Sequence, residues 1–132
     1  MSDRGVLDTS VFIASETGRP LNEDLLPEEA AVSVVTLAEL QAGVLAARDT
    51  ETRSRRMATL DVVSDVEILP IDAEVARIWA QLRVQLAEAG RRINVNDLWI
   101  AATAARHRPP VVSRDDDFRA VDGMSGVVVL TV

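Results

Sequence analysis

The sequence contains no cysteine, no lysine and no tyrosine, and it has only one histidine. Without cysteine the chain forms neither disulfide bonds nor thiolate metal sites, so any metal chemistry must rely on oxygen ligands. The absence of cysteine also fits a reducing compartment, and we expect a cytoplasmic protein.

Long hydrophobic runs are also missing, since no apolar stretch approaches the length that crosses a bilayer. The first residues lack the basic and apolar regions of a secretory signal. We therefore expect a soluble protein with no membrane partner. A length of 132 residues and a hydrophobic content of 48% are typical of one domain, which we expect to span residues 1–132.

All 14 basic residues are arginine, and 21 acidic residues bring the formal net charge to -7. This balance argues against nonspecific nucleic-acid binding. If several acids surround metal ions, they do not count as surface charge, and the composition then permits a polyanionic substrate. The arginines at 48, 53, 55 and 56 lie in a predicted charged turn that can contact RNA, although a solvated helix edge is the commoner explanation.

Short β-branched runs alternate with longer helical patterns, which predicts an α/β fold with a mainly parallel sheet. The predicted strands cover residues 5–7, 31–35, 66–69, 110–112 and 127–132. These runs lack polar alternation, as is typical of strands buried on both faces.

Three helices are indicated by apolar spacing. One covers residues 73–89 and ends at Gly90, and another follows Thr36. The third, over residues 97–105, is apolar nearly all round, so we expect it to pack centrally. Asp97 opens this helix, where an unpaired charge is costly unless a cap, a partner or a metal ion compensates it.

Four acidic residues follow predicted strands or open helices: Asp8, Glu39, Asp97 and Asp115. The carboxyl ends of parallel strands converge on one crevice, so these acids can meet in space. Several carboxylates stay ionised together only when their repulsion is compensated, and the hard cations Mg²⁺ or Mn²⁺ suit oxygen ligands. Such a site is suited to phosphodiester hydrolysis by metal-activated water.

Each acid also has a purely structural interpretation. Asp8 can cap a helix, Thr36 and Glu39 together form a capping-box pattern, and Asp97 can favour a helix dipole. Asp115 to Asp117 can be a solvated turn. Taken singly, the acids leave both interpretations open.

Four segments, in this order along the chain, resemble the PIN domain and in particular the VapC toxins of bacterial toxin–antitoxin pairs. They are LDTSVF at 7–12, TLAELQAG at 36–43, NDLWIAA at 96–102 and SRDDDF at 113–118. The resemblance spans nearly the whole chain and implies a three-layer α/β/α fold.

The resemblance also implies roles for individual residues. Asp8, Glu39 and Asp97 are expected to bind the metal, with Asp115 completing the cluster and Asp117 as its competitor. The hydroxyl of Ser10 is expected to support the site, although ordinary helix capping explains it equally well.

At the level of function, the resemblance implies an Mg²⁺- or Mn²⁺-dependent endoribonuclease that cuts cellular RNA such as tRNA. It also implies neutralisation by a cognate VapB-type antitoxin and assembly as a homodimer.

Two other functions fit the same pattern less well. A noncatalytic binding module on a PIN scaffold would be marked by loss of the acids, which are all present. An aspartate-based phosphoryl-transfer domain typically needs a lysine, which this chain lacks. His107 has little weight as a general base, and Trp79 and Trp99 are expected in the core.

Overall fold

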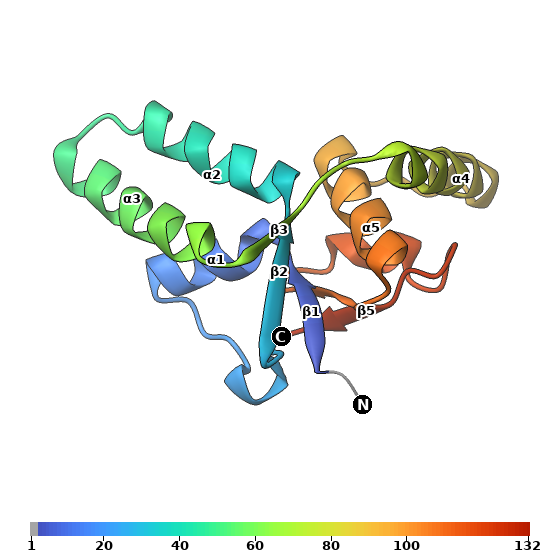
Figure 1. Ribbon diagram of the computed structural model, residues 1–132, viewed down its shortest axis with the longest axis horizontal. Coiled ribbons are helices and arrows are strands. Elements are labelled where there is room, and N and C mark those ends of the chain that lie inside the picture. The colour runs from blue at the N-terminus through green and yellow to red at the C-terminus, as the bar shows by residue number, and fades with distance from the viewer. Residues whose placement is uncertain (1–2) are drawn as a thin grey trace.

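The computed structural model describes residues 3–132, and Figure 1 shows a sheet with helices on both sides. The strands are β1 (Arg4–Leu7), β2 (Glu29–Ser33), β3 (Glu67–Leu69), β4 (Val111–Ser113) and β5 (Val129–Thr131). The α-helices are α1 (Thr9–Thr17), α2 (Val34–Ala46), α3 (Thr50–Ser64), α4 (Ala73–Ala89) and α5 (Val95–His107). Short 3-10 helices are η1 (Glu23–Leu25) and η2 (Asp117–Val121).

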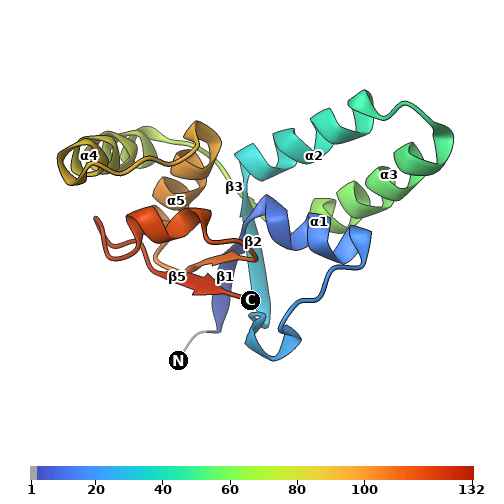
Figure 2. The ribbon, with the colours of Figure 1, turned by 180° about the vertical axis from the view of Figure 1, so that it is seen from behind.

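Three layers are visible when the two opposite views are compared. Helices α1, α2 and α3 lie on one side of the sheet, and α4 and α5 lie on the other (Figures 1 and 2). Each side has its own apolar cluster: Leu82 and Ile100 belong to the one that includes α4 and α5, and Phe12 and Val63 to the other. The predicted α/β/α architecture is confirmed.

The five strands are all parallel, in the order β3-β2-β1-β4-β5. Val6 in the central strand β1 pairs with Ala31 of β2 and with Val111 of β4. The chain first builds the sheet outward through β2 and β3, and then continues on the other side of β1. Residues that follow β1, β2 and β4 therefore meet at one edge, where the strand order changes direction.

Helices α4 and α5 pack as their apolar patterns predict. Helix α4 has the predicted bounds, with Asp72 as its N-cap and Gly90, at φ +67°, closing it in the left-handed conformation that favours glycine. Ile100 and Ala101 of α5 are fully buried, which confirms the central position of that helix. Asn94 caps α5, so the helix begins two residues before Asp97, which lies in its first turn.

Two tryptophans join these helices. The rings of Trp79 in α4 and Trp99 in α5 stack with centroids 4.9 Å apart and an interplanar angle of 18°. Both side chains are partly buried against the larger apolar cluster. Their predicted place in the core is confirmed.

Two predictions on the other side of the sheet are wrong. Strand β2 ends at Ser33, and the Ser33 hydroxyl accepts a hydrogen bond from the backbone N–H of Val35, so α2 begins there. Thr36 therefore lies inside the helix and does not begin a capping box. The predicted turn over residues 48–56 is also too long, because the Asp49 carboxylate caps α3 from Thr50 onward.

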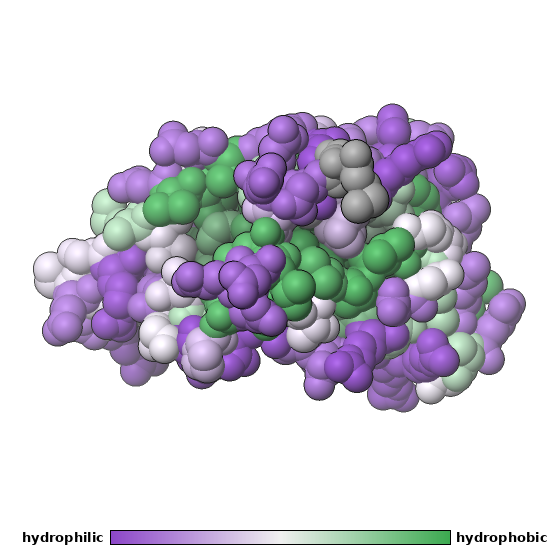
Figure 3. Space-filling model, turned by 90° about the horizontal axis from the view of Figure 1, so that it is seen from below, coloured by the Kyte–Doolittle hydropathy of each residue, from purple (hydrophilic) through white to green (hydrophobic). Residues whose placement is uncertain are grey.

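The surface at the end of the molecule where β1 begins is partly hydrophobic. Figure 3 shows this end with hydrophobic residues gathered in its middle and hydrophilic residues around them.

In the part of the chain that the structure describes, no helix is both long enough and apolar enough to cross a membrane.

Gly5 in β1 leads to the first stability prediction. A Cβ atom at this position would lie 2.7 Å from Val112 Cγ2 and 2.9 Å from Pro27 Cγ, closer than packed atoms allow. We expect Gly5→Ala to lower the free energy of unfolding by about 1–3 kcal/mol, as overpacking does. Urea unfolding followed by circular dichroism measures this change.

Gly43 in α2 is the matched control, since a Cβ atom there meets no atom nearer than Arg56 Cδ at 3.9 Å. Gly43→Ala should stabilise the helix by up to about 1 kcal/mol. Equal stability of the Gly5→Ala and wild-type proteins would show that β1 and Pro27 have room to separate.

Candidate active site

Asp8 is held at the end of the central strand. Its backbone N–H donates to the carbonyl oxygen of Val112 in β4 at 2.9 Å. Its carboxylate accepts from the N–H of Ser10 at 3.3 Å and so caps α1, while the residue is only 3% exposed. The capping interpretation is thus confirmed, and the same carboxylate also faces the other acids.

Ser113 connects two of the predicted site residues. Its fully buried hydroxyl lies 3.1 Å from Asp8 Oδ2 and 3.2 Å from Asp115 Oδ1. The Ser10 hydroxyl lies 3.3 Å from it and accepts from the N–H of Arg114 at 3.0 Å. Ser10 therefore links the ends of β1 and β4 through its side chain, and Asp8 rather than Ser10 caps the helix.

Glu39 lies on α2, on the opposite side of this network. Its Oε1 accepts a hydrogen bond of 2.7 Å from the hydroxyl of Thr9, the residue after Asp8. The Thr9 hydroxyl is also 3.2 Å from that of Thr36, which is fully buried. Two threonines thus fix the position of the Glu39 carboxylate relative to the end of β1.

Asp97 has the most perturbed carboxyl group of the site. Its pKa is raised from the ordinary 3.8 to about 7, mainly by partial burial and in addition by the negative charges of Asp8 and Asp115. Glu39 and Asp117 act in the same direction. The negative charges of all four other acids thus act on this one carboxyl.

Asp8 is perturbed in the same direction. Burial raises its pKa, the charge of Asp115 raises it further, and hydrogen bonds from Ser10 and Ser113 partly oppose this rise. For both acids, burial is the main cause of the raised pKa and neighbouring negative charge is a further one.

Asp115 and Asp117 differ in their surroundings. Asp115 is half-buried, and its Oδ1 lies within hydrogen-bond distance of the Ser113 hydroxyl and accepts from the N–H of Asp117 at 3.1 Å. The side chain of Asp117 is exposed at the start of η2. The hydrogen-bond network thus includes the carboxylate of Asp115 and not that of Asp117.

We refer to Asp8, Glu39, Asp97 and Asp115 together as the carboxylate cluster. Within residues 3–132, no three acidic or histidine side chains lie close enough together to hold a metal ion as they stand. In these positions the carboxylates contact hydroxyl groups instead: Thr9 holds Glu39, and Ser113 lies between Asp8 and Asp115. The donors nevertheless fit a hard cation in kind, because they are carboxylate oxygens whose mutual repulsion a cation would relieve.

His107 does not join the cluster. It ends α5, whereas Asp97 lies in the first turn, so the two are separated along the helix by roughly 15 Å. The general-base role, which had little weight from the sequence, has no geometric support.

The sequence motifs contained two residues whose role was missed. Thr9 holds Glu39, and Ser113 lies between Asp8 and Asp115. The available signal was their position, since each small hydroxyl residue directly adjoins a predicted acid or ends the strand before it.

Proteins of similar sequence show the family to which the chain belongs. The PIN domain family matches residues 5–124. The chain is 58% identical to Ribonuclease VapC5 of Mycobacterium tuberculosis, with 97% of this chain and 95% of that protein covered. It is 41% identical to Ribonuclease VapC4 of the same organism, with 98% and 97% covered.

Among solved structures, the fold matches the crystal structure of VapBC-5, a member of the VapBC family of toxin–antitoxin systems from Mycobacterium tuberculosis. The TM-score is 0.92 at 55% sequence identity, and the match covers 98% of this chain and 99% of that one. The identity and coverage are high for both sequence and structure. The chain therefore belongs to the PIN-domain family, in the group of the VapC ribonucleases.

Proposed function

We propose that this chain is a metal-dependent endoribonuclease and the toxin of a toxin–antitoxin pair, acting as a single domain. The observation that carries the proposal is the carboxylate cluster, which includes a carboxyl group with a pKa of about 7, at the edge where the strand order reverses. The names of the relatives VapC5 and VapC4 support ribonuclease activity.

The carboxylate cluster would hold Mg²⁺ or Mn²⁺, with Asp117 as the competitor of Asp115. When bound, the cation lowers the pKa of water and neutralises negative charge that develops on the phosphate and the leaving oxygen. Hydrolysis of the P–O3′ bond then leaves a 5′-phosphate on one product and a 3′-hydroxyl on the other.

The protein contributes orientation. Ser113 and the N–H of Ser10 fix Asp8, and Thr9 fixes Glu39, so these carboxylates lose little freedom when a cation binds. Asp97 has a raised pKa, so cation binding near neutral pH would release the proton that it carries.

We propose a VapB-type antitoxin as the partner, together with a homodimer, in the cytoplasm where RNA and antitoxin are made. The structural match to VapBC-5 supports a toxin–antitoxin pair. A crowded negative site is also a good receptor for an arginine, whose guanidinium pairs with carboxylates through two hydrogen bonds. Native mass spectrometry of the protein co-expressed with its neighbouring gene product tests both associations, and a lone monomer would contradict them.

The two alternative functions have less support. A noncatalytic module would not need to keep acids whose charges raise the pKa of Asp97, and such repulsion costs stability. The chain belongs to the PIN family, which disagrees with a phosphoryl-transfer domain. It also lacks the lysine that phosphoryl-transfer domains typically use.

Metal dependence is the direct test of the proposed activity. With Mg²⁺ or Mn²⁺, we expect the purified protein to cut cellular RNA internally, leaving 5′-phosphate and 3′-hydroxyl ends, because water is the attacking group. EDTA should abolish cleavage, and excess Mn²⁺ should restore it. Sequencing of the RNA ends gives the result, and full activity in EDTA or 2′,3′-cyclic phosphate ends would contradict the mechanism.

Substitutions that remove charge but keep shape test the individual acids. Asp8→Asn and Asp97→Asn should each reduce the cleavage rate at least about 100-fold, as loss of metal-site groups does. Asp115→Asn should reduce the rate more than Asp117→Asn, because only Asp115 belongs to the hydrogen-bond network. The reverse order would make Asp117 the fourth ligand.

The raised pKa of Asp97 predicts how stability changes with pH. Because its pKa in the folded protein, about 7, exceeds the ordinary 3.8, folding favours its protonated form. In EDTA, this group should therefore lower the free energy of unfolding as the pH rises from about 4 to about 7, with no further loss above.

Thermal unfolding of wild type and Asp97→Asn at pH 4.5 and pH 8, both in EDTA, measures this effect. The variant should gain stability over wild type at pH 8 and little at pH 4.5. Asp61→Asn, on the exposed surface of α3, controls for the loss of one negative charge. The same gain at both pH values would show that Asp97 does not carry the repulsion.

A further inference from the structure

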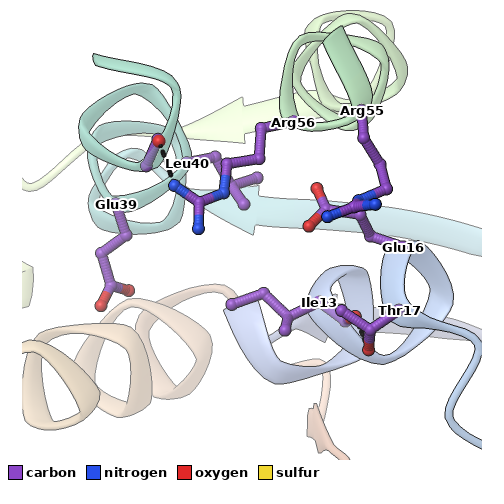
Figure 4. A pocket seen from close by; sticks show the side chains of 8 residues that line it. Ile13, Glu16, Thr17, Glu39, Leu40, Arg55 and Arg56 are labelled. Atoms are coloured by element: carbon purple, nitrogen blue, oxygen red, sulfur yellow. Dashed lines mark hydrogen bonds between the residues drawn. The ribbon is translucent and has the colours of Figure 1, made fainter. Parts of the chain in front are cut away.

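A cavity of about 260 Å³ lies between α1, α2 and α3, beside the carboxylate cluster. Glu39 belongs to both, because it lines the cavity and its charge also reaches Asp97. Figure 4 shows Ile13, Glu39 and Arg56 around this space, each coming from a different helix. A group bound in the cavity would therefore lie next to the proposed cleavage site.

The size and walls of the cavity suit a single flat ring system. Its volume is below the usual range for drug-sized ligands, which begins at about 300 Å³. Ile13 and Leu40 give it apolar walls, and Gly43 contributes no side chain that would fill it. Nucleobases bind in such spaces through their flat faces, with polar groups contacting their edges.

The hydrogen-bond donors of the cavity are two arginines from α3. The Arg56 guanidinium donates to the carbonyl oxygen of Gly43 at 2.7 Å, which keeps it at the cavity wall (Figure 4). None of the ion pairs found among residues 3–132 includes Arg55 or Arg56. Each guanidinium has five N–H groups, so most donors remain available to a ligand.

Two carboxylates line the cavity, Glu16 on α1 and Glu39 on α2, and Glu16 is the one outside the carboxylate cluster. Its Oε1 accepts a hydrogen bond of 2.9 Å from the Thr59 hydroxyl on α3, which orients the carboxylate. This bond uses one of the two carboxylate oxygens. The cavity thus combines two positioned carboxylates, Glu16 and Glu39, with two guanidinium groups within one small space.

We propose that this cavity binds a guanine base of the RNA, adjacent to the bond that is cut; the inference rests on the proposed ribonuclease function. Guanine presents the acceptors O6 and N7, which arginine recognises, and the neighbouring donors N1–H and N2–H₂, which a carboxylate accepts. Adenine and the pyrimidines do not offer two adjacent donors together with two such acceptors.

An apolar side chain of a protein partner fits the cavity less well. It would cover Glu16, Arg55 and Arg56 without giving them hydrogen bonds, and burying unpaired charges is costly. Guanine accepts hydrogen bonds from the arginines and donates hydrogen bonds to the carboxylate, so the chemistry of the cavity favours the RNA base.

The test uses a pool of RNA hairpins with a fixed stem and a randomised loop, cleaved in Mn²⁺ and sequenced at the new 5′ ends. Wild type should favour guanine at one position beside the cut by about tenfold or more, in line with a good edge contact. Glu16→Gln and Gly43→Leu should reduce that preference to about twofold or less while cleavage of the pool continues.

One control keeps the outcome interpretable. Glu74→Gln removes an exposed carboxylate on α4, a helix that does not line the cavity. This variant should keep the wild-type preference. Thermal unfolding of every variant tests whether it is folded. Gly43 lies inside α2 without a positive φ, so residues other than glycine can adopt its backbone conformation.

Failure of this inference differs from failure of the proposed function. If wild type cuts the pool without base preference, or if Glu16→Gln and Gly43→Leu keep the preference, the cavity does not read guanine while ribonuclease activity stands. If wild type cuts no RNA in Mn²⁺, both proposals fall. If Gly43→Leu keeps the preference but escapes inhibition by the co-expressed antitoxin, the cavity belongs to the protein partner.

Discussion

Repulsion among carboxylates at one edge of the sheet is the constraint on which the rest of the structure depends. The strand order places the end of β1 between those of β2 and β4, and α5 carries its own acid to the same edge. Burial is the main cause that raises the pKa of Asp97 to about 7, and the negative charges of the neighbouring acids add to this rise. A cation or a cationic partner at this edge would relieve the repulsion.

Hydroxyl groups make this crowding structurally tolerable. Ser113 lies between Asp8 and Asp115, and Thr9 holds Glu39. Hydrogen bonds to the charged forms oppose the rise in pKa of Asp8, which burial and the charge of Asp115 cause. The same contacts fix the directions of the carboxylates, so the network serves both stability in the absence of a cation and orientation in its presence.

Periodic patterns made much of the fold predictable from the sequence. Helix α4 has the predicted bounds because its apolar stripe, its cap and Gly90 agree. The predicted start of α2, after Thr36, was wrong because Ser33 and Thr36 are both residues that cap helices well. Only the position at which strand β2 ends decides between them. The acids could be predicted as site residues from their motifs, whereas contacts such as Thr9 with Glu39 join residues 30 apart and need the folded chain.

The central claim is that the carboxylate cluster is a cation site. Crystals grown with Mn²⁺, measured on both sides of the manganese absorption edge, test it most directly. The account predicts an anomalous peak surrounded by carboxylate oxygens of Asp8, Glu39, Asp97 and Asp115. Manganese bound only elsewhere in such crystals, with Asp97 making no contact to it, would contradict the account.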